Sequence, residues 1–348
     1  MKIDIEETKP INGVKWKIVT LTNNQGMSVT FLNFGGIITK ILVPDKNGKL
    51  ENVVLAYKNE EQYLTNPGYL GAIIGRVAGR IQGASFKIDD KTFKVDDNEG
   101  IHCLHGGTSG LNNALWEIEP YQSFNELCVK LSHRSKDGEG GFPGNLDIEV
   151  IYKLNTRNQL TIDYIASTDK KTPITLTNHS YFNLSGNAKR TIHDHEIAVD
   201  SKEFIELDEE LIPTGKLLDV SGTTFDFRNS RLLQKGFNND FYQNRLAGSG
   251  YDHYFVFEHK QEEQIWLKDK ESGRTLSVKT NQPGFVMYTS NNLEEGLELT
   301  EGITEKYLGV CLETQGTPVS LHHHNFPSIV QNENDVYKKQ TIFTFGIG

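Results

Sequence analysis

Leu146-Asp147-Ile148-Glu149-Val150-Ile151-Tyr152-Lys153-Leu154 is the stretch of sequence that decides the fold. Every second side chain from Leu146 to Leu154 is apolar, and charged residues occupy most of the positions between them. Successive side chains of a β-strand point to opposite faces, so this alternation predicts a strand with one face in a core and one face toward solvent.

Segments of the same kind lie on both sides of this stretch. Residues 160–164 alternate again after a polar turn, and residues 85–88 and 93–95 flank the polar residues 89–92 as the two arms of a hairpin. Helical periodicity is scarce, and residues 59–64 fit only one or two turns. Because parallel sheets need crossover helices, we predict an all-β fold, a large antiparallel β-sandwich with few short helices.

The chain of 348 residues contains no fixed-period repeat, low-complexity tract or linker rich in proline and serine. Large β-sandwiches can reach this length as one domain. Hydrophobic residues make up 36% of the chain, which is enough for a sizeable core. We therefore expect a single domain over residues 1–348.

Charge and cysteine content narrow the choice of partners. The formal net charge of −10 disfavours nucleic acid and anionic membranes. Three cysteines without CxxC spacing predict neither a disulfide framework nor a thiolate zinc site. No apolar run approaches the roughly 18 residues that a membrane span needs, and the N-terminus has no apolar leader core. We expect a cytoplasmic monomer or homodimer that binds a small uncharged molecule.

Residues 178–184 (NHSYFNL) place the imidazole of His179 among hydroxyl, amide and aromatic side chains. Imidazole exchanges protons near neutral pH, while rings and amides bind polar ligands of the size of a sugar. A histidine whose hydrogen bonds are satisfied inside a sheet would explain the segment equally well. The segment alone leaves both interpretations open.

Residues 75–81 (GRVAGRI) place two arginines, Arg76 and Arg80, among small residues that let a ligand approach the backbone. A planar guanidinium can offer such a ligand a fork of donors. We expect one of the two arginines to be structural. A phosphate loop is disfavoured because no strand–GxxxxGK[ST]–helix pattern surrounds the segment.

Histidines occur close together at two places. His102 and His105 have a spacing that could hold a metal on a helix, but Gly106-Gly107 argues against a helix there. We expect a strand end that delivers a histidine into a cleft. Residues 322–324 are three consecutive histidines without acidic or thiolate residues nearby in the sequence, and we interpret them as a loop. No metal site is predicted.

Two carboxylates lie in unusual surroundings. Asp252 stands between aromatic residues and is suited to accept hydrogen bonds from hydroxyl groups, although a structural turn would explain it as well. Glu313 interrupts an apolar, strand-like run at residues 310–315. Burial there would raise the pKa of its carboxyl and make it a better base, and such burial is costly without a purpose or a partner.

These segments together resemble the aldose 1-epimerase (galactose mutarotase) family over nearly the whole chain. The motifs that carry the resemblance, in the family's order, are GRVAGRI (75–81), LHGG (104–107), NHSYFNL (178–184), DH (252–253) and CLETQ (311–315). The segments 141–144, 211–215, 225–228 and 325–328 are also similar. The resemblance implies the family's galactose mutarotase-like β-sandwich and interconversion of the α and β forms of free aldoses without a cofactor.

The resemblance also implies roles for individual residues. Glu313 matches the catalytic base and His179 the catalytic acid, and His105 and Arg80 match residues that contact the sugar beside the reacting centre. The remaining matches to substrate-binding positions are Asp252, Gln282, Ser180, Tyr181 and Phe182. Many relatives have asparagine where this chain has Gly79, so we expect Gly79 to affect sugar preference more than chemistry.

Anomer interconversion needs one base and one acid, because the C1 hydroxyl loses a proton while the ring oxygen gains one. A carboxylate is ionised at neutral pH and a histidine titrates near it, so Glu313 and a protonated His179 suit these roles. Galactose and glucose both fit as substrates. The alternatives are a hexose-6-phosphate mutarotase, with Arg76 beside Arg80 as a phosphate clamp, a glycoside-cleaving enzyme with paired carboxylates, and a non-catalytic sugar-binding module.

Overall fold

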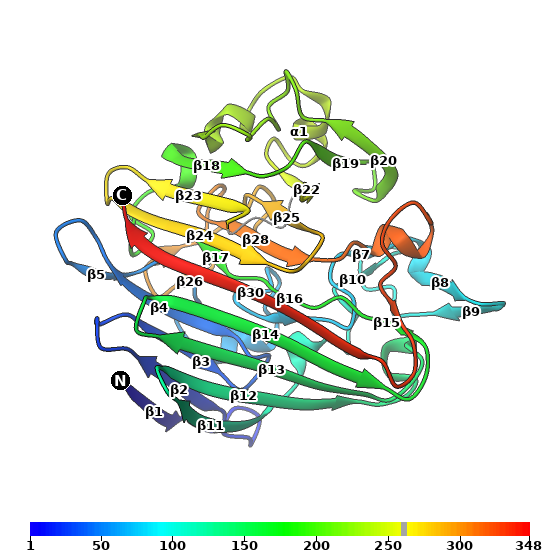
Figure 1. Cartoon of the computed structure of the whole chain (residues 1–348), viewed down its shortest axis with the longest axis horizontal. Coiled ribbons are helices and arrows are strands. Elements are labelled where there is room, and N and C mark those ends of the chain that lie inside the picture. Colours follow the sequence, from blue (N-terminus) through cyan, green and yellow to red (C-terminus); the bar gives the residue numbers. More distant parts are fainter. Residues whose placement is uncertain (259–262) are drawn as a thin grey trace.

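Three large antiparallel β-sheets contain most of the strand residues of the chain (Figure 1). The structure is a computed structural model that describes residues 1–258 and 263–348. Within these residues the sheets have nine, six and five strands. The prediction of an all-β antiparallel fold is therefore confirmed.

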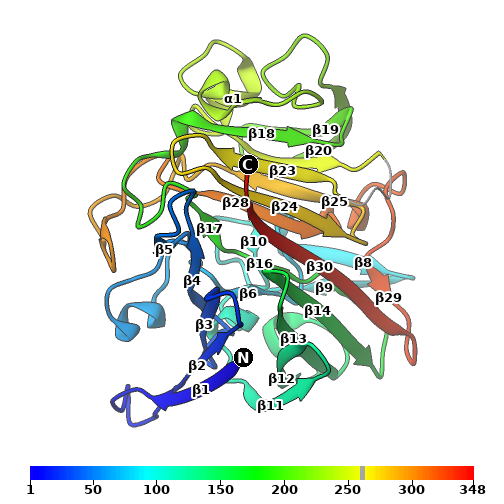
Figure 2. The same ribbon diagram turned by 60° about the vertical axis from the view of Figure 1, so that its left-hand side comes forward.

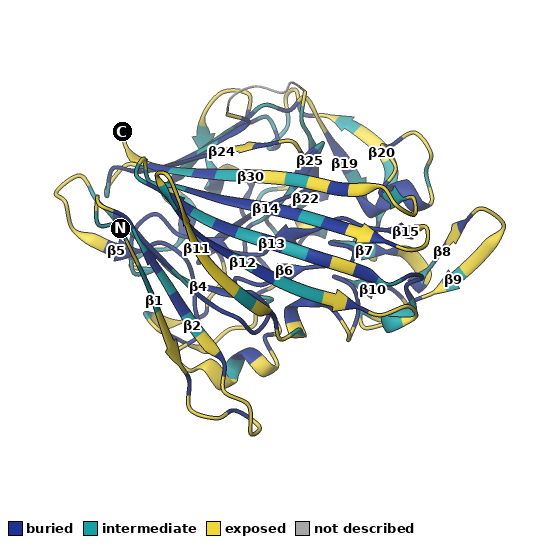
Figure 3. Ribbon diagram, turned by 60° about the horizontal axis from the view of Figure 1, so that its bottom comes forward, coloured by how far each residue is buried: buried dark blue, intermediate teal, exposed yellow. Residues whose placement is uncertain are grey.

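The nine-stranded sheet contains the stretch that decided the fold. Its strands, in spatial order, are β11 (Glu117–Ser123), β12 (Glu126–Ser135), β13 (Leu146–Asn155), β14 (Gln159–Thr168), β30 (Val336–Ile347), β24 (Arg274–Thr280), β23 (Ile265–Asp269), β18 (His195–Val199) and β21 (Arg231–Leu232). Buried and less buried residues alternate along β13 (Figure 3). Every second residue from Leu146 to Leu154 is buried, as the period of two predicts.

The two other large sheets are built from strands that are mostly shorter. The six-stranded sheet, in spatial order, consists of β17 (Tyr181–Phe182), β28 (Val310–Gln315), β25 (Gly284–Tyr288), β22 (Asp252–Val256), β19 (Glu203–Leu207) and β20 (Pro213–Asp219). The five-stranded sheet consists of β1 (Lys2–Glu7), β2 (Lys17–Thr22), β3 (Ser28–Leu32), β4 (Ile38–Pro44) and β5 (Leu50–Asn52).

Short strand pairs and turns connect these sheets. The pairs are β6 (Ile73–Ile74) with β16 (Thr177–Asn178), β7 (Arg80–Ile81) with β10 (Cys103–Leu104), β8 (Ser85–Ile88) with β9 (Lys91–Lys94), β15 (Thr172–Pro173) with β29 (Val330–Gln331), and β26 (Glu298–Leu299) with β27 (Gly302–Ile303). The predicted hairpin at residues 85–95 is the β8–β9 pair.

Helices are few and short in the part of the chain that the structure describes. They are one α-helix, α1 (Tyr242–Leu246), and the 3₁₀ turns η1 (Glu60–Leu64), η2 (Gln82–Ala84), η3 (Leu111–Asn113), η4 (Glu139–Gly141), η5 (Ile192–Asp194), η6 (Leu233–Gly236) and η7 (Pro318–Leu321). The turn η1 corresponds to the predicted helical residues 59–64. None of the described helices has the length and apolarity needed to cross a membrane.

The hydrophobic core lies between the sheets. Behind β30 and β24, Figure 1 shows β28 and β25 of the six-stranded sheet, and Phe182 of β17 packs against Phe343 and Phe345 of β30. The five-stranded sheet lies beside β12 to β14 (Figure 2), where the Tyr152 hydroxyl donates a hydrogen bond to the Gly36 carbonyl at 2.7 Å. One face of the six-stranded sheet is thus buried, and its other face is free to form a site.

Candidate active site

A cavity of about 300 Å³ lies over the second face of the six-stranded sheet. Residues directly opposite each other on neighbouring strands share a face, and the register pairs Asp252 with Tyr288, Tyr288 with Cys311, and Val286 with Glu313. The side chains that form the cavity floor are Asp252, Tyr254, Val286, Tyr288, Glu313, Gln315 and Tyr181. The walls come from loops near β7, β10 and β16, which contribute Arg80, His105 and His179.

Glu313 lies on β28, a strand that has neighbours on both sides, β17 and β25. Its side chain is buried, with 2% of the residue exposed. Burial raises the pKa of the Glu313 carboxyl well above its usual value, and the charge of Asp252 adds to this while the Arg80 guanidinium opposes it. The expectation that burial raises this pKa is confirmed, and a carboxyl of raised pKa is suited to exchange protons near neutral pH.

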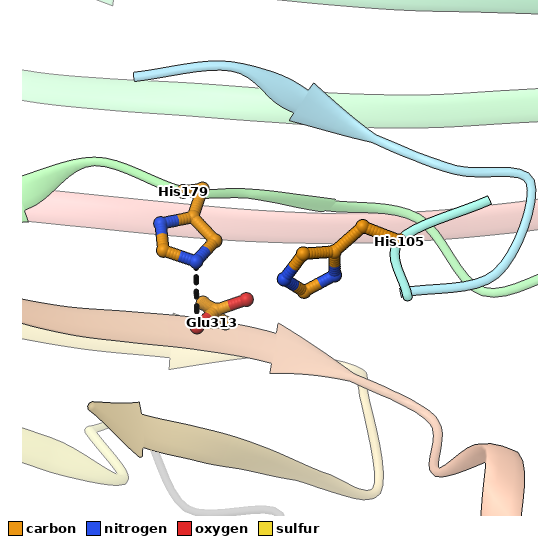
Figure 4. Close-up of side chains that lie close together, drawn as sticks. All are labelled: His105, His179 and Glu313. Carbon is orange, nitrogen blue, oxygen red and sulfur yellow. Dashed lines mark ion pairs between the residues drawn. The ribbon is translucent and has the colours of Figure 1, made fainter. Parts of the chain in front are cut away.

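His179 lies between β16 and β17, where the backbone is held on both sides. Its N–H donates to the Ala72 carbonyl, and its carbonyl accepts from the N–H of Gly71. Nε2 of the ring lies 3.5 Å from Oε1 of Glu313 (Figure 4). An imidazole and a carboxylate from segments far apart in the sequence thus face each other inside one cavity.

The protonation of His179 differs from the expectation. Burial lowers its pKa to about 4, because the imidazolium form loses the stabilisation that water would give. The expectation that His179 is protonated near neutral pH does not agree with this low pKa. The sequence could not reveal this because the shift depends on the side chains that surround the ring.

His105 follows β10 directly and has a positive φ of 54°. It is fixed to Gly79 by two hydrogen bonds of 3.1 Å: its N–H donates to the Gly79 carbonyl, and the Gly79 N–H donates to its Nδ1. Burial also keeps the pKa of His105 well below its usual value. A neutral ring whose Nδ1 accepts carries its proton on Nε2, and Figure 4 shows that nitrogen turned toward Glu313 and His179.

Gly106 explains why glycine follows His105. Its φ is +89°, and a Cβ atom there would lie 2.0 Å from the carbonyl oxygen of Gly75. Only glycine fits such a close approach of two backbone segments. The sequence prediction of a strand end that delivers a histidine into a cleft is confirmed by β10 and the turn that follows it.

His105, His179 and Glu313 have the composition of a metal site, and their ligand atoms lie within 4.8 Å of one another. A metal at Nε2 of His105 would need a lone pair on that nitrogen. The Gly79 N–H requires the lone pair on Nδ1 instead, so the proton occupies Nε2. The donor set therefore does not fit a metal ion in this tautomer.

Arg80 is held between two carboxylates. Its Nε and Nη2 donate to the two oxygens of Glu99 at 2.6 and 3.0 Å, and its Nη1 lies 3.4 Å from Oδ2 of Asp252. Burial opposes the charge of Arg80, but Asp252 and Glu99 outweigh burial and raise its pKa. Burial raises the pKa of Asp252, against the influence of Arg80. The β7–β10 pair places Arg80 opposite Leu104, beside His105.

Three tyrosine rings surround His179. The ring centroids of Tyr69, Tyr181 and Tyr288 lie 6.0, 5.1 and 6.4 Å from that of His179, and Tyr69 also packs against His105 at 4.7 Å. Aromatic rings beside charged groups give the mixed apolar and polar surface that binds small polar ligands. The expectation that Tyr181 lines the pocket agrees with the cavity.

Ser180 and Phe182 lie elsewhere than expected. The Ser180 hydroxyl donates to Oδ1 of Asn178 at 2.6 Å, and Phe182 packs in the hydrophobic core. The reason is the strand period of two, which turns His179 and Tyr181 toward the cavity and their neighbours away from it. The assignment of Ser180 and Phe182 to the pocket wall was wrong.

Gln282 also lies outside this cavity. It is buried, and its Nε2 donates to the hydroxyl of Tyr337 at 3.2 Å and to the carbonyl of Leu176 at 3.4 Å, beside a separate cavity. The assignment of Gln282 to sugar binding does not agree with this position, because Gln282 lines the separate cavity and not the one that holds Glu313 and His179. Gly79 does line the active cavity, as expected.

Arg76 is the structural arginine of the pair. Its guanidinium donates to the carbonyls of Pro143, Ser135 and Lys136 at 2.8 to 3.1 Å and is buried away from the cavity.

Several further residues line the cavity and were not predicted from the sequence, among them Glu99, Tyr69, Tyr288 and Gln315. The sequence could have indicated Gln315, because side chains two residues apart on a strand share a face and Gln315 follows Glu313 at that distance. No comparable pattern marks Glu99 or Tyr69.

Comparison with known proteins agrees with this geometry. A family model described as aldose 1-epimerase matches residues 17–344. The galactose mutarotase of Homo sapiens is 38% identical over 324 residues, which cover 92% of each chain. The aldose 1-epimerase of Escherichia coli (strain K12) is 33% identical over 324 residues, which cover 91% of this chain and 90% of that protein.

A solved structure shares the fold over its full length. It is that of galactose 1-epimerase from Lactobacillus acidophilus NCFM, with a TM-score of 0.90 and 27% identity, and the match covers 100% of this chain and 99% of that chain. The family match and the identity to curated relatives lead to one conclusion. This chain belongs to the aldose 1-epimerase family.

Proposed function

We propose that this chain is an aldose 1-epimerase, an isomerase that interconverts the α and β anomers of free hexoses such as galactose and glucose without a cofactor. The observation that carries the proposal is the buried pair of Glu313 and His179, 3.5 Å apart in a cavity that also holds Asp252 and Arg80. The names of the curated relatives, galactose mutarotase and aldose 1-epimerase, support the same reaction.

Glu313 and His179 each act once when the sugar ring opens and once, with reversed roles, when it closes. Glu313 takes the proton of the C1 hydroxyl, the bond between C1 and the ring oxygen breaks, and His179 gives a proton to the ring oxygen. The resulting aldehyde turns about the bond between C1 and C2 and presents its other face. His179 then takes back the proton of the former ring hydroxyl as that oxygen attacks C1, and Glu313 returns its proton to the carbonyl oxygen.

One proton on the pair is enough for this cycle. Burial favours the neutral forms of both groups, which places the proton on Glu313 rather than on His179. The two arrangements differ only in the position of that proton across the 3.5 Å between Oε1 and Nε2. Hydrogen bonds from sugar hydroxyls to the carboxylate stabilise the ionised arrangement, because such bonds are stronger than those to a neutral carboxyl.

His105 and Arg80 stabilise charge that develops on the sugar. The Nε2–H of His105 points into the cavity and donates to an oxygen at the reacting centre, and Arg80 contributes a positive charge that is held in place by Glu99. Asp252 accepts hydrogen bonds from hydroxyls remote from C1 and so orients the sugar.

A phosphorylated substrate is disfavoured by the charges of the cavity. Among the described lining residues Arg80 is a cation, whereas Glu99, Asp252, Glu294 and Glu313 are carboxylates. Arg76, the second arginine of a possible clamp, is bound by backbone carbonyls outside the cavity. We expect kcat/KM for glucose to exceed that for glucose 6-phosphate by more than about tenfold, and the reverse order would overturn the choice of substrate class.

The proposal is tested by polarimetry of freshly dissolved α-galactose and α-glucose, corrected for the spontaneous reaction. We expect Glu313→Gln to lower kcat by about 10²- to 10⁴-fold, because loss of a general base costs that much. Galactose binding, measured by calorimetry, should survive in this variant. The control is Glu149→Gln, which changes a half-buried carboxylate on β13 that pairs with Lys130 outside the cavity.

Two outcomes would contradict the proposal. If Glu313→Gln keeps the wild-type rate, Glu313 is not the base. If the wild-type protein binds galactose but leaves the spontaneous rate unchanged, the chain is a sugar-binding module.

A further inference from the structure

Both ring nitrogens of His179 have a partner on the same strand. Nε2 faces Glu313, and Nδ1 lies 3.5 Å from the sulfur of Cys311. Cys311 and Glu313 are two residues apart on β28, so they project from the same face of the strand. A thiol and a carboxylate from one strand therefore contact the two sides of one imidazole.

The thiol of Cys311 is a neutral group with two hydrogen-bonding roles. It is fully buried, and burial raises its pKa well above the usual value of a thiol. A neutral thiol can donate through S–H and can also accept at sulfur. Tyr181 lies beside it as a second partner, and the Tyr181 hydroxyl gives its own proton to the Gly68 carbonyl at 2.7 Å.

These contacts satisfy His179 in both of its protonation states. The ring exchanges its proton at Nε2, which faces Glu313 and the cavity, so Nδ1 keeps its hydrogen in both states and donates it to the sulfur of Cys311. The S–H of Cys311 turns to the oxygen of the Tyr181 hydroxyl. No proton is transferred between Cys311 and His179 in this exchange. A carboxylate in the same place would instead bind the protonated ring tightly and make it a weaker acid.

We propose that Cys311 is a positioning residue for His179, and that its sulfur accepts the hydrogen bond of Nδ1–H and so keeps Nε2 as the nitrogen that gains and loses a proton. This inference rests on the proposed function, in which His179 alternates between acid and base. Cys311 itself touches no sugar, because it lies behind the ring and does not line the cavity.

Among the described residues, Cys311 is the hydrogen-bond partner of Nδ1 of His179. The titratable groups that face the ring are Glu313 and Cys311 from β28, Tyr181 from β17, Tyr288 from β25, and Tyr69 and His105 from loops. Glu313 is the one carboxylate in this set, and it faces Nε2. The pKa of His179 therefore responds to a change at residue 311 through Nδ1.

The test compares Cys311→Ala, which removes the partner, with Cys311→Ser, which keeps a group that donates and accepts. We expect Cys311→Ala to lower kcat by about tenfold with KM within about twofold of wild type, by analogy with partners that orient ligating histidines. Cys311→Ser should retain most of the wild-type kcat. Cys128→Ala is the control, because Cys128 is buried in β12, away from the cavity.

The pKa of His179, followed by the ¹⁵N shifts of its ring, gives a second readout that does not depend on activity. Loss of the acceptor at Nδ1 destabilises the protonated ring, so the pKa falls in Cys311→Ala. A hydroxyl is a stronger acceptor than a thiol, so the pKa in Cys311→Ser stays equal to that of wild type or rises. Unchanged thermal midpoints would show that the variants are folded.

The inference is overturned if His179 titrates at the same pH in wild type, Cys311→Ala and Cys311→Ser. It is also overturned if a folded Cys311→Ala has wild-type kcat, or if Cys311→Ser loses as much kcat as Cys311→Ala. Failure of the proposed function looks different, since the wild-type protein would then accelerate no aldose while the shifts of the His179 ring still report on Cys311.

Discussion

His105 and His179 lie in the same cavity, with ring centroids 5.3 Å apart, yet their ring nitrogens have different partners. Nδ1 of His105 accepts from a backbone N–H, which cannot change roles, so its proton remains on Nε2. Nδ1 of His179 contacts a thiol sulfur, which accepts the Nδ1–H and leaves Nε2 to gain and lose a proton. His105 is thus suited to remain a neutral donor, and His179 is suited to exchange a proton.

Asp252→Asn should change both binding and the pH dependence of the reaction. The charge of Asp252 raises the pKa of Glu313, so its removal lowers that pKa. Glu313 must be ionised to act as the base. The fall of kcat at acid pH, seen in a plot of kcat against pH, therefore moves to lower pH. KM should rise by about tenfold, because a neutral amide accepts weaker hydrogen bonds than a carboxylate.

The measurement for Asp252→Asn is polarimetry between pH 4 and 8, with Asp147→Asn on the exposed side of β13 as the control. A fall of kcat that stays at the same pH or moves to higher pH would contradict the coupling between Asp252 and Glu313.

Removal of metal ions should leave the rate unchanged. The tautomer of His105 opposes metal binding at the cluster of His105, His179 and Glu313. We expect extensive dialysis against a chelator to change kcat by less than about 20%, within the usual error of such rates. A loss of rate that added Zn²⁺ restores would mean that His105 changes tautomer to bind metal.

Some features of single residues could be predicted from the sequence and others could not. Glu313 was recognisable because a carboxylate in an apolar strand is unusual, and His179 because its neighbours are polar and aromatic. The ion pair between Arg80 and Glu99 could not be predicted, since the segment between β9 and β10 has to bring Glu99 back to β7. The low pKa of His179 was equally hidden, because it depends on burial by side chains from several segments.

At the scale of elements, the cavity depends on the alternation of side chains along β28. Cys311, Glu313 and Gln315 point to the cavity side, while Leu312 lies in the core and Thr314 contacts Thr341 of β30. The same alternation, applied to residues 179–182, would have separated the cavity residues from Ser180 and Phe182. The motif resemblance treated these residues as one group, so it assigned Ser180 and Phe182 to the cavity wall together with Tyr181.

The turn after β10 should be intolerant of a side chain at Gly106. A Cβ at Gly106 would collide with the Gly75 carbonyl at 2.0 Å, and the φ of +89° adds strain, so we expect Gly106→Ala to lower the free energy of unfolding by about 3 kcal/mol or more. Gly48→Ala is the matched control, because Gly48 has a φ of +82° but a Cβ there would have no other atom within 4 Å.

Urea unfolding of both variants measures the difference. Gly48→Ala should cost about 1 kcal/mol from backbone strain alone. Gly106→Ala should also lose activity, because its turn positions His105. Equal costs for the two variants would contradict the close approach of residues 75 and 106.

At the scale of the whole molecule, buried histidines link stability to pH. Burial lowers the pKa of His179 and His195 to about 4 and that of His253 to about 3. In the unfolded chain these residues bind protons near pH 6.5, whereas the folded protein binds them only below about pH 4. The free energy of unfolding therefore falls as pH decreases from 6.5 to 4.

The raised pKa values of Glu313 and Asp252 oppose this trend, since these carboxyls bind protons more readily in the folded protein. The three histidines change the free energy of unfolding by more than the two carboxyls do. We therefore expect the free energy of unfolding to fall by about 3 kcal/mol or more between pH 6.5 and 4.5. Urea midpoints at half-unit pH steps provide the measurement. A midpoint that is constant or rises on acidification would contradict the neutral state of these histidines.

The sequence predicted the fold class because β13 and its neighbours alternate so regularly, but it could not predict the order of strands. Pairing in the nine-stranded sheet joins β14 to β30, which lie far apart in the sequence. Such pairings depend on which apolar faces fit together after folding.

The position of β30 has a consequence for synthesis on the ribosome. This strand lies between β14 and β24, so β11–β14 and the strands from β24 to β21 are joined only through it. Both parts leave the exit tunnel before residues 336–347 do, and each then exposes an unpaired strand edge. Two open edges, one on β14 and one on β24, can therefore pair with other chains until β30 has emerged from the ribosome.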